Sequence, residues 1–127
     1  MHRWFSAGDS GDVEAFDELL HEHVVVHAPM GLSTNGREAE KQVWRDAIAA
    51  MPDLRHDIQE LWVTESGMAA RVVVSGTLAG TFAGVRGSGQ AFQIDQATFV
   101  HLRDGRAVEI WEVADTGSLL RQLGVAE

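Results

Sequence analysis

The chain has 127 residues, of which 45% are hydrophobic and 23% charged, a balance typical of one soluble domain over residues 1–127. The formal net charge of -9 disfavours nucleic acid as a partner, because phosphate backbones would be repelled. The absence of cysteine excludes disulfides and thiolate metal sites. No apolar run approaches the roughly 18 residues of a membrane span, and the N-terminus lacks the apolar core of a signal peptide. We therefore expect a cytoplasmic protein that binds neither nucleic acid nor membrane.

The N-terminal half of the sequence is typical of helices with one short strand between them. The Trp-Phe pair within Met1–Ala7 indicates a first helix. Asp12, or Ser10 before it, can cap a second helix over VEAFDELL, whose apolar residues fall on one face at helical spacing. The strand VVVHAP, Val24–Pro29, ends at proline, and a third helix is predicted from about Arg37 to Met51.

The C-terminal half alternates in the manner of long strands. Three helices followed by an antiparallel meander predict an α+β fold, in which a curved, cone-shaped antiparallel sheet packs against three N-terminal helices. The glycine-rich segment Thr77–Gly89 supplies places where the strands can bend, and the interior of a cone can hold a small apolar ligand. The strands are expected near Asp57–Glu65, Ala69–Phe82, Gln90–Leu102 and Arg106–Ala114, with a final short helix at Ser118–Leu123.

The turn of the last hairpin sets the register of its strands, and with it the residues that share a face of the sheet with Asp115. The sequence LRDGR is compatible with two different turns. A two-residue turn at Asp104-Gly105 puts His101 on the face away from Asp115. A three-residue loop that also includes Arg103 puts both on one face, and we favour it because arginine suits the type I turn before a glycine bulge. The shared face then contains Asp95, Ala97, Phe99, His101, Glu109, Trp111, Val113 and Asp115, opposite a strongly apolar face with Phe92, Ile94, Val100, Leu102, Val108 and Ile110. We expect one face to line a pocket and the other to meet helices or a second subunit.

Four stretches, which together cover nearly the whole chain, resemble the SnoaL-like polyketide cyclase family of the nuclear-transport-factor-2-like superfamily. They are SAGDSGDVEAFDELLHEHVVVHAP, GREAEKQVWRDAIAAMPDLRHDI, RVVVSGT followed by GTFAGV, and DGRAVEIWEVADTGSLLRQLG. The resemblance implies a cofactor-independent, metal-free cyclase that closes a polyketide ring by intramolecular aldol condensation. It implies an acid/base aspartate at Asp115 and a histidine beside it at His101. Many members read Gly-Thr-His where this chain has Gly76-Thr77-Leu78, so one polar pocket contact of the family is missing here.

The chemistry also follows from the residue types. Aldol closure needs a base for a proton next to a carbonyl, and donors for the enolate oxygen. A carboxylate at Asp115 in an apolar pocket would be an effective base near neutral pH. The expected donors are His101, His27, Thr77 and Gln93, and the expected substrate-binding walls are Phe82, Phe99, Trp111 and Val113.

Other interpretations of these residues remain open. Asp115 is also placed to cap the final helix, and His101 to lie at the surface near a turn. His21-Glu22-His23 lacks a third ligand at a useful spacing, so no metal site is predicted. The alternative to a cyclase is a non-catalytic small-molecule-binding protein of the same fold, or a related isomerase or hydrolase. In either case we expect a small apolar or aromatic ligand and a homodimer formed through the convex face of the sheet.

Overall fold

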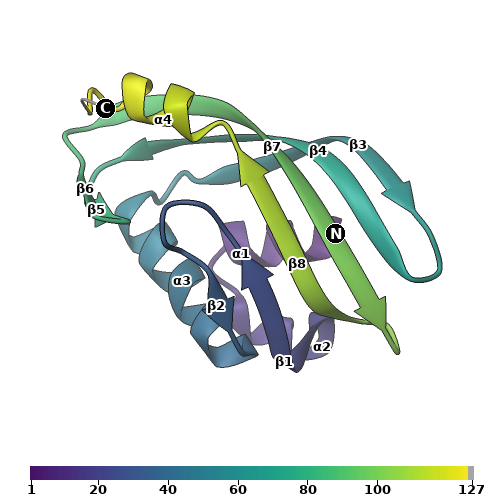
Figure 1. The fold of residues 1–127 in the computed structure, drawn as a ribbon. Coiled ribbons are helices and arrows are strands. Elements are labelled where there is room, and N and C mark those ends of the chain that lie inside the picture. Colours follow the sequence, from purple (N-terminus) through teal and green to yellow (C-terminus); the bar gives the residue numbers. More distant parts are fainter. Residues whose placement is uncertain (126–127) are drawn as a thin grey trace.

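A computed structural model describes residues 1–125 of the chain (Figure 1). Helices and strands alternate in the first half, and long strands make up most of the second. The elements are α1 (His2–Asp9), η1 (Val13–Ala15), α2 (Phe16–Leu19), β1 (Leu20–His27), β2 (Thr34–Asn35), α3 (Arg37–Ala50), β3 (Arg55–Val63), β4 (Gly67–Leu78), β5 (Thr81–Phe82), β6 (Val85–Arg86), β7 (Gln90–Arg103), β8 (Arg106–Ala114) and α4 (Thr116–Gln122). None of the helices in this range is long and apolar enough to cross a membrane.

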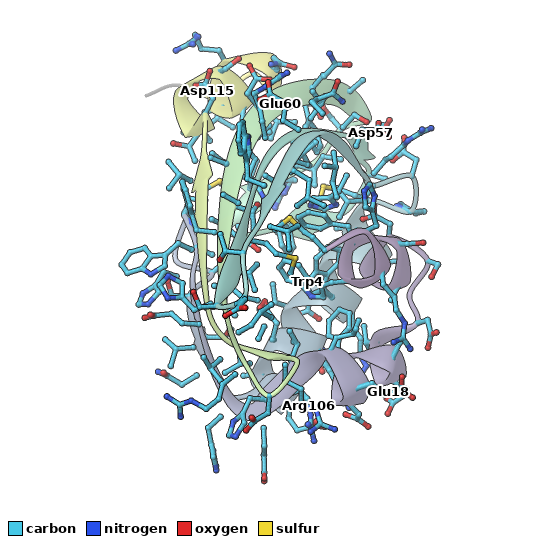
Figure 2. All side chains as sticks on the ribbon, turned by 90° about the vertical axis from the view of Figure 1, so that its right-hand side faces the viewer. Trp4, Glu18, Asp57, Glu60, Arg106 and Asp115 are labelled. Carbon is cyan, nitrogen blue, oxygen red and sulfur yellow. The ribbon has the colours of Figure 1, made fainter. Side chains whose placement is uncertain are left out.

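Six strands form one curved sheet in the order β2-β1-β8-β7-β4-β3, and α1, α2 and α3 lie on the same side of it (Figures 1 and 2). The predicted α+β fold is confirmed. Several details differ from the sequence prediction: β1 begins at Leu20 rather than Val24, the predicted helix VEAFDELL ends at Leu19, and β2 was not predicted. Two further differences concern the sheet. β1 joins the meander as a parallel neighbour of β8, and the predicted strand to Phe82 ends at Leu78, after which β5 and β6 form a separate hairpin.

The alternation of residues along β7 decides which face of the sheet is buried. Phe92, Ile94 and Val100 are buried together with Gln96 and Thr98, whereas most of the residues between them are exposed. The buried set faces the helices, where Phe16 of α2 and Trp44 of α3 pack edge to face with ring centroids 6.0 Å apart. The concave side of the sheet is therefore the interior of the molecule, and the other set of β7 residues lies on the convex outer side.

The turn between β7 and β8 is the two-residue Asp104-Gly105 turn, so the predicted three-residue loop is wrong. Arg103 pairs with Arg106, and both turn residues have positive φ angles, as a type I′ turn requires. The predicted shared face nevertheless exists, because a bulge follows the turn and places His101 opposite Glu109. A bulge on the second strand and a longer loop both shift the strand pairing by one residue. The sequence of the turn alone therefore does not distinguish them.

Candidate active site

A cavity of about 140 Å³ lies in the concave side of the sheet, beneath α3. Its wall is mostly apolar and is completed by the segment after β1, the β5–β6 hairpin and α4. The lining residues include Leu54, Val74, Leu78, Phe82, Phe92, Ile94, Ala114 and Leu119. Five polar side chains interrupt this apolar wall: Glu40, His56, Gln96, Glu112 and Thr116. Among residues 1–125, no lysine or arginine lines the cavity.

Glu40 comes from the first turns of α3 and is only 2% exposed. Burial and, to a smaller extent, the charge of the nearby Glu112 raise the pKa of its carboxyl to about 8, against a hydrogen bond from Thr34 that lowers it. The Thr34 hydroxyl donates to Glu40 Oε2 over 3.4 Å. Because this pKa lies above neutral pH, Glu40 mostly carries a proton in neutral solution and can donate a hydrogen bond into the cavity.

Glu112 lies on β8 opposite Thr98 of β7, on the concave face. Burial raises the pKa of its carboxyl to about 7, while the charge of His56 acts in the opposite direction. A carboxyl with this pKa is divided between its acid and base forms at neutral pH, which is the condition for an efficient general base. Next to it, Gln96 donates to the Thr98 hydroxyl over 3.0 Å.

His56, near the start of β3, is held by Asp9, the last residue of α1. Asp9 Oδ1 lies 2.7 Å from His56 Nδ1, and Asp9 Oδ2 accepts from the His56 backbone N–H, also over 2.7 Å. The imidazole ring stacks on Phe5 with 4.6 Å between ring centroids and lies 5.1 Å from the ring of Trp44. The imidazole therefore has a fixed position in the wall of the cavity.

The sequence profile of the SnoaL-like polyketide cyclases matches residues 1–123. The chain belongs to this family. Curated protein sequences give no match.

Several solved structures superpose on almost the whole chain. TsrD from Streptomyces laurentii is 26% identical with a TM-score of 0.89, and the match covers 99% of this chain and 92% of TsrD. IdmH from Streptomyces antibioticus, a candidate polyketide cyclase, is 33% identical with a TM-score of 0.79, covering 95% of this chain and 93% of IdmH. A SnoaL-like protein from Jannaschia sp. has a TM-score of 0.87 at 18% identity, with 98% of this chain and 89% of that chain covered, and supports the fold alone.

The structure of this SnoaL-like protein places Asp115 outside the cavity. Asp115 is exposed at the point where β8 ends and α4 begins, as Figure 2 shows. Its Oδ1 accepts a hydrogen bond from the backbone N–H of Ser118 over 3.1 Å, so it caps α4. The expectation that Asp115 faces an apolar pocket is wrong, because the face it shares with His101 is the convex one.

Most of the other predicted site residues also lie on the convex face of the sheet and not in the cavity. Phe99, Trp111 and Val113 are exposed on the convex face, where His101 is also exposed opposite Glu109. His27 hydrogen-bonds to Glu109 over 2.8 Å and stacks on Trp111 with ring centroids 3.6 Å apart. These five side chains therefore gather on one surface, but it is not the surface of the cavity.

The remaining three predicted residues have separate positions. The Thr77 hydroxyl and backbone N–H both donate to Asp53, each over 2.8 Å. Gln93 exchanges hydrogen bonds through its backbone with the Gln122 side chain. Phe82 does line the cavity, and so does Leu78, the position where many family members have histidine. The missing histidine therefore makes the cavity wall more apolar.

Three titratable groups of the cavity, Glu112, Glu40 and His56, were not predicted as site residues, although two of them left a signal in the sequence. Glu112 falls between Ile110 and Ala114 on the apolar face of β8, where a carboxylate is out of place. Glu40 lies four residues before Trp44 on the buried side of α3. His56 has no such signal, because its partner Asp9 is distant in sequence. Among residues 1–125, no group of three or more metal-ligating side chains is placed to hold a metal ion.

Proposed function

We propose that this SnoaL-like protein is a cofactor-independent polyketide cyclase that closes a ring by intramolecular aldol condensation, with Glu112 as its acid/base group. The observation that carries the proposal is the presence of two carboxyls, Glu40 and Glu112, inside an apolar cavity lined by no lysine or arginine. Burying two such groups without a lysine or arginine partner costs folding free energy, and groups of this kind gather at functional sites. In this proposal Glu112 takes the role that the sequence analysis gave to Asp115.

Glu112 and Glu40 have separate roles in the proposed ring closure. Ionised Glu112 takes a proton from the carbon next to a substrate carbonyl, and the C–H electron pair becomes the enolate. Protonated Glu40 donates a hydrogen bond to the enolate oxygen, where negative charge develops. The enolate carbon then attacks a second carbonyl of the same chain. This forms the new C–C bond, and the carbonyl π electrons move to oxygen, which becomes an alkoxide and takes up a proton.

The apolar wall contributes by orientation. Side chains such as Phe82, Phe92 and Leu119 would hold a flat aromatic ketone in a folded shape with its reacting carbons close together. Exclusion of water strengthens the hydrogen bond from Glu40 and keeps Glu112 weakly solvated. The substrate class that fits this wall is a small aromatic polyketone with little charge.

Deuterium exchange into α-tetralone, an aromatic ketone with exchangeable protons beside its carbonyl, tests the proton-abstraction step by mass spectrometry. We expect the protein to accelerate the exchange and the rate to rise with pH around a midpoint of about 7, as Glu112 ionises. An aromatic ketone that binds without faster exchange at any pH would instead support the non-catalytic binding protein.

We further propose that the convex face of the sheet joins two copies of the chain. Trp62, Phe99 and Trp111 lie in one cross-strand row and are 72%, 44% and 44% exposed. Exposed apolar rows of this kind mark interaction surfaces, and a two-fold axis would bring the row against its own copy.

We expect light scattering to give twice the 13.9 kDa mass of one chain. The double variant Trp62→Glu/Val113→Asp should be monomeric, whereas Ala49→Glu on the exposed side of α3 should leave the mass unchanged; a monomeric wild type would contradict the proposal.

A further inference from the structure

The pair formed by Asp9 and His56 is a polar arrangement at the cavity wall to which the proposed reaction gives no task. It connects the end of α1 to the start of β3 through two hydrogen bonds of 2.7 Å each. The side chains of His56 and Asp9 are 9% and 17% exposed. A buried imidazole bound to a carboxylate is the arrangement by which many enzymes position a proton-transfer histidine.

The hydrogen bond to Asp9 decides which nitrogen of His56 exchanges protons. An ionised carboxylate can only accept hydrogen bonds, so Nδ1 carries the proton that lies between the two side chains. In residues 1–125 no hydrogen bond to Nε2 is formed. With Nδ1 turned to Asp9 and one ring face covered by Phe5, Nε2 is the nitrogen left to exchange a proton with a molecule in the cavity.

His56 and Glu112 line the same cavity from two different strands. His56 lies on β3 and Glu112 on β8. The curvature of the sheet brings these strands within electrostatic reach, since the charge of His56 stabilises ionised Glu112. A base and a proton donor on different walls suit a reaction that removes a proton at one carbon and delivers one to an oxygen elsewhere in the substrate.

We propose that His56, positioned by Asp9, protonates the alkoxide formed in the ring closure. The inference rests on the proposed function. In the imidazolium form, Nε2–H gives its proton to the alkoxide oxygen, and His56 becomes neutral with Nδ1–H still bound to Asp9. Glu112 holds the proton taken from carbon, and this proton returns to Nε2 through solvent when the product leaves. No proton is gained or lost over the cycle, in which His56 is a catalytic residue and Asp9 a positioning residue.

Two probe reactions separate the two proton transfers. Exchange of α-tetralone needs only the base and the hydrogen bond from Glu40 to the enolate oxygen, whereas ring closure of ortho-diacetonylbenzene also needs the alkoxide to be protonated. We expect His56→Gln to slow ring closure by at least about 100-fold and to leave the exchange rate within about two-fold of wild type. His23→Gln, which changes an exposed histidine of β1, is the matched control and should leave both rates unchanged.

The Asp9→Asn variant tests the positioning role. We expect the kcat of ring closure to fall by at least about 10-fold with KM and the exchange rate nearly unchanged. The imidazole ¹⁵N signals should show protonated Nδ1 in the wild type and mixed tautomers in Asp9→Asn. A purely structural contact would change these signals without lowering kcat, so an unchanged kcat in a folded Asp9→Asn variant with mixed tautomers would overturn the positioning role. This variant also keeps the inference testable if His56→Gln fails to fold.

The outcomes distinguish this inference from the proposed function. Ring closure at the wild-type rate in a folded His56→Gln variant would overturn the role of His56 and leave Glu112 as acid/base. A wild-type protein that accelerates neither probe reaction would overturn the proposed function, and the role of His56 with it.

Discussion

The Glu112→Gln variant is expected to exchange α-tetralone protons about 100- to 10,000-fold more slowly than the wild type. Glutamine matches glutamate in size but cannot accept the substrate proton as a carboxylate does. The variant should fold at least as well as the wild type, because the cost of burying a carboxyl whose pKa is raised to about 7 is removed. A lost rate together with an unchanged or higher melting temperature would therefore be an effect on the chemistry.

The corresponding variant, Asp115→Asn, tests whether Asp115 or Glu112 is the acid/base group. Asparagine caps helices about as well as aspartate, so Asp115→Asn should keep the bond to Ser118 and leave α4 intact. We expect its exchange rate to stay within about two-fold of wild type. If Asp115→Asn lost the rate and Glu112→Gln kept it, the acid/base role would belong to Asp115, as the family resemblance first indicated.

The second large effect concerns stability, through Glu40. Its pKa is about 8 in the folded protein against 4.5 for an ordinary glutamate, so the folded state binds more protons than the unfolded state between these pH values. The free energy of unfolding should be highest toward pH 4.5 and fall as pH rises through about 8, by up to about 1.4 kcal/mol per pH unit from this group. Acidic conditions therefore favour the fold as far as Glu40 is concerned.

Replacing Glu40 with glutamine should remove this dependence. We expect urea unfolding of Glu40→Gln to show a flatter stability profile from pH 5 to pH 9 and a more stable protein than wild type at the alkaline end. The control is Glu65→Gln in the exposed turn between β3 and β4, which makes the same chemical change outside the cavity. A wild type that gains stability from pH 6 to pH 9, or a Glu40→Gln profile parallel to it, would mean that Glu40 is ionised throughout.

The fold was predictable because its signals are local. The helical spacing of VEAFDELL and the alternation in β7 and β8 each belong to one segment, and their order agrees with the family resemblance. The parallel pairing of β1 with β8 was not predictable in the same way, because the sequence of β1 does not indicate which strand it pairs with. The end of β4 at Leu78 likewise depends on the separate β5–β6 hairpin.

The site was harder to predict. The face of the last hairpin that was expected to line the pocket is the convex face, so every residue on it lies outside the cavity. Alternation showed correctly that Phe99, Trp111 and Asp115 share a side, but both sides of the last hairpin are partly apolar, and hydrophobicity alone does not tell which one is concave. The stronger signal was Glu112 within the more apolar set. His56 and Asp9 could not be paired from the sequence, since 47 positions separate them and only the packing of α1 on β3 brings them together.

We propose that the working site of this SnoaL-like protein lies inside the cone, at Glu112 and Glu40. Crystals grown with β-naphthol, a planar aromatic hydroxyl compound that resembles an enol, test it most directly. We expect density for the naphthol rings within the apolar wall beneath α3, with the hydroxyl oxygen within about 3.2 Å of a carboxyl oxygen of Glu112 or Glu40. Naphthol bound on the convex face beside Asp115 and Trp111, with the cavity empty, would contradict it.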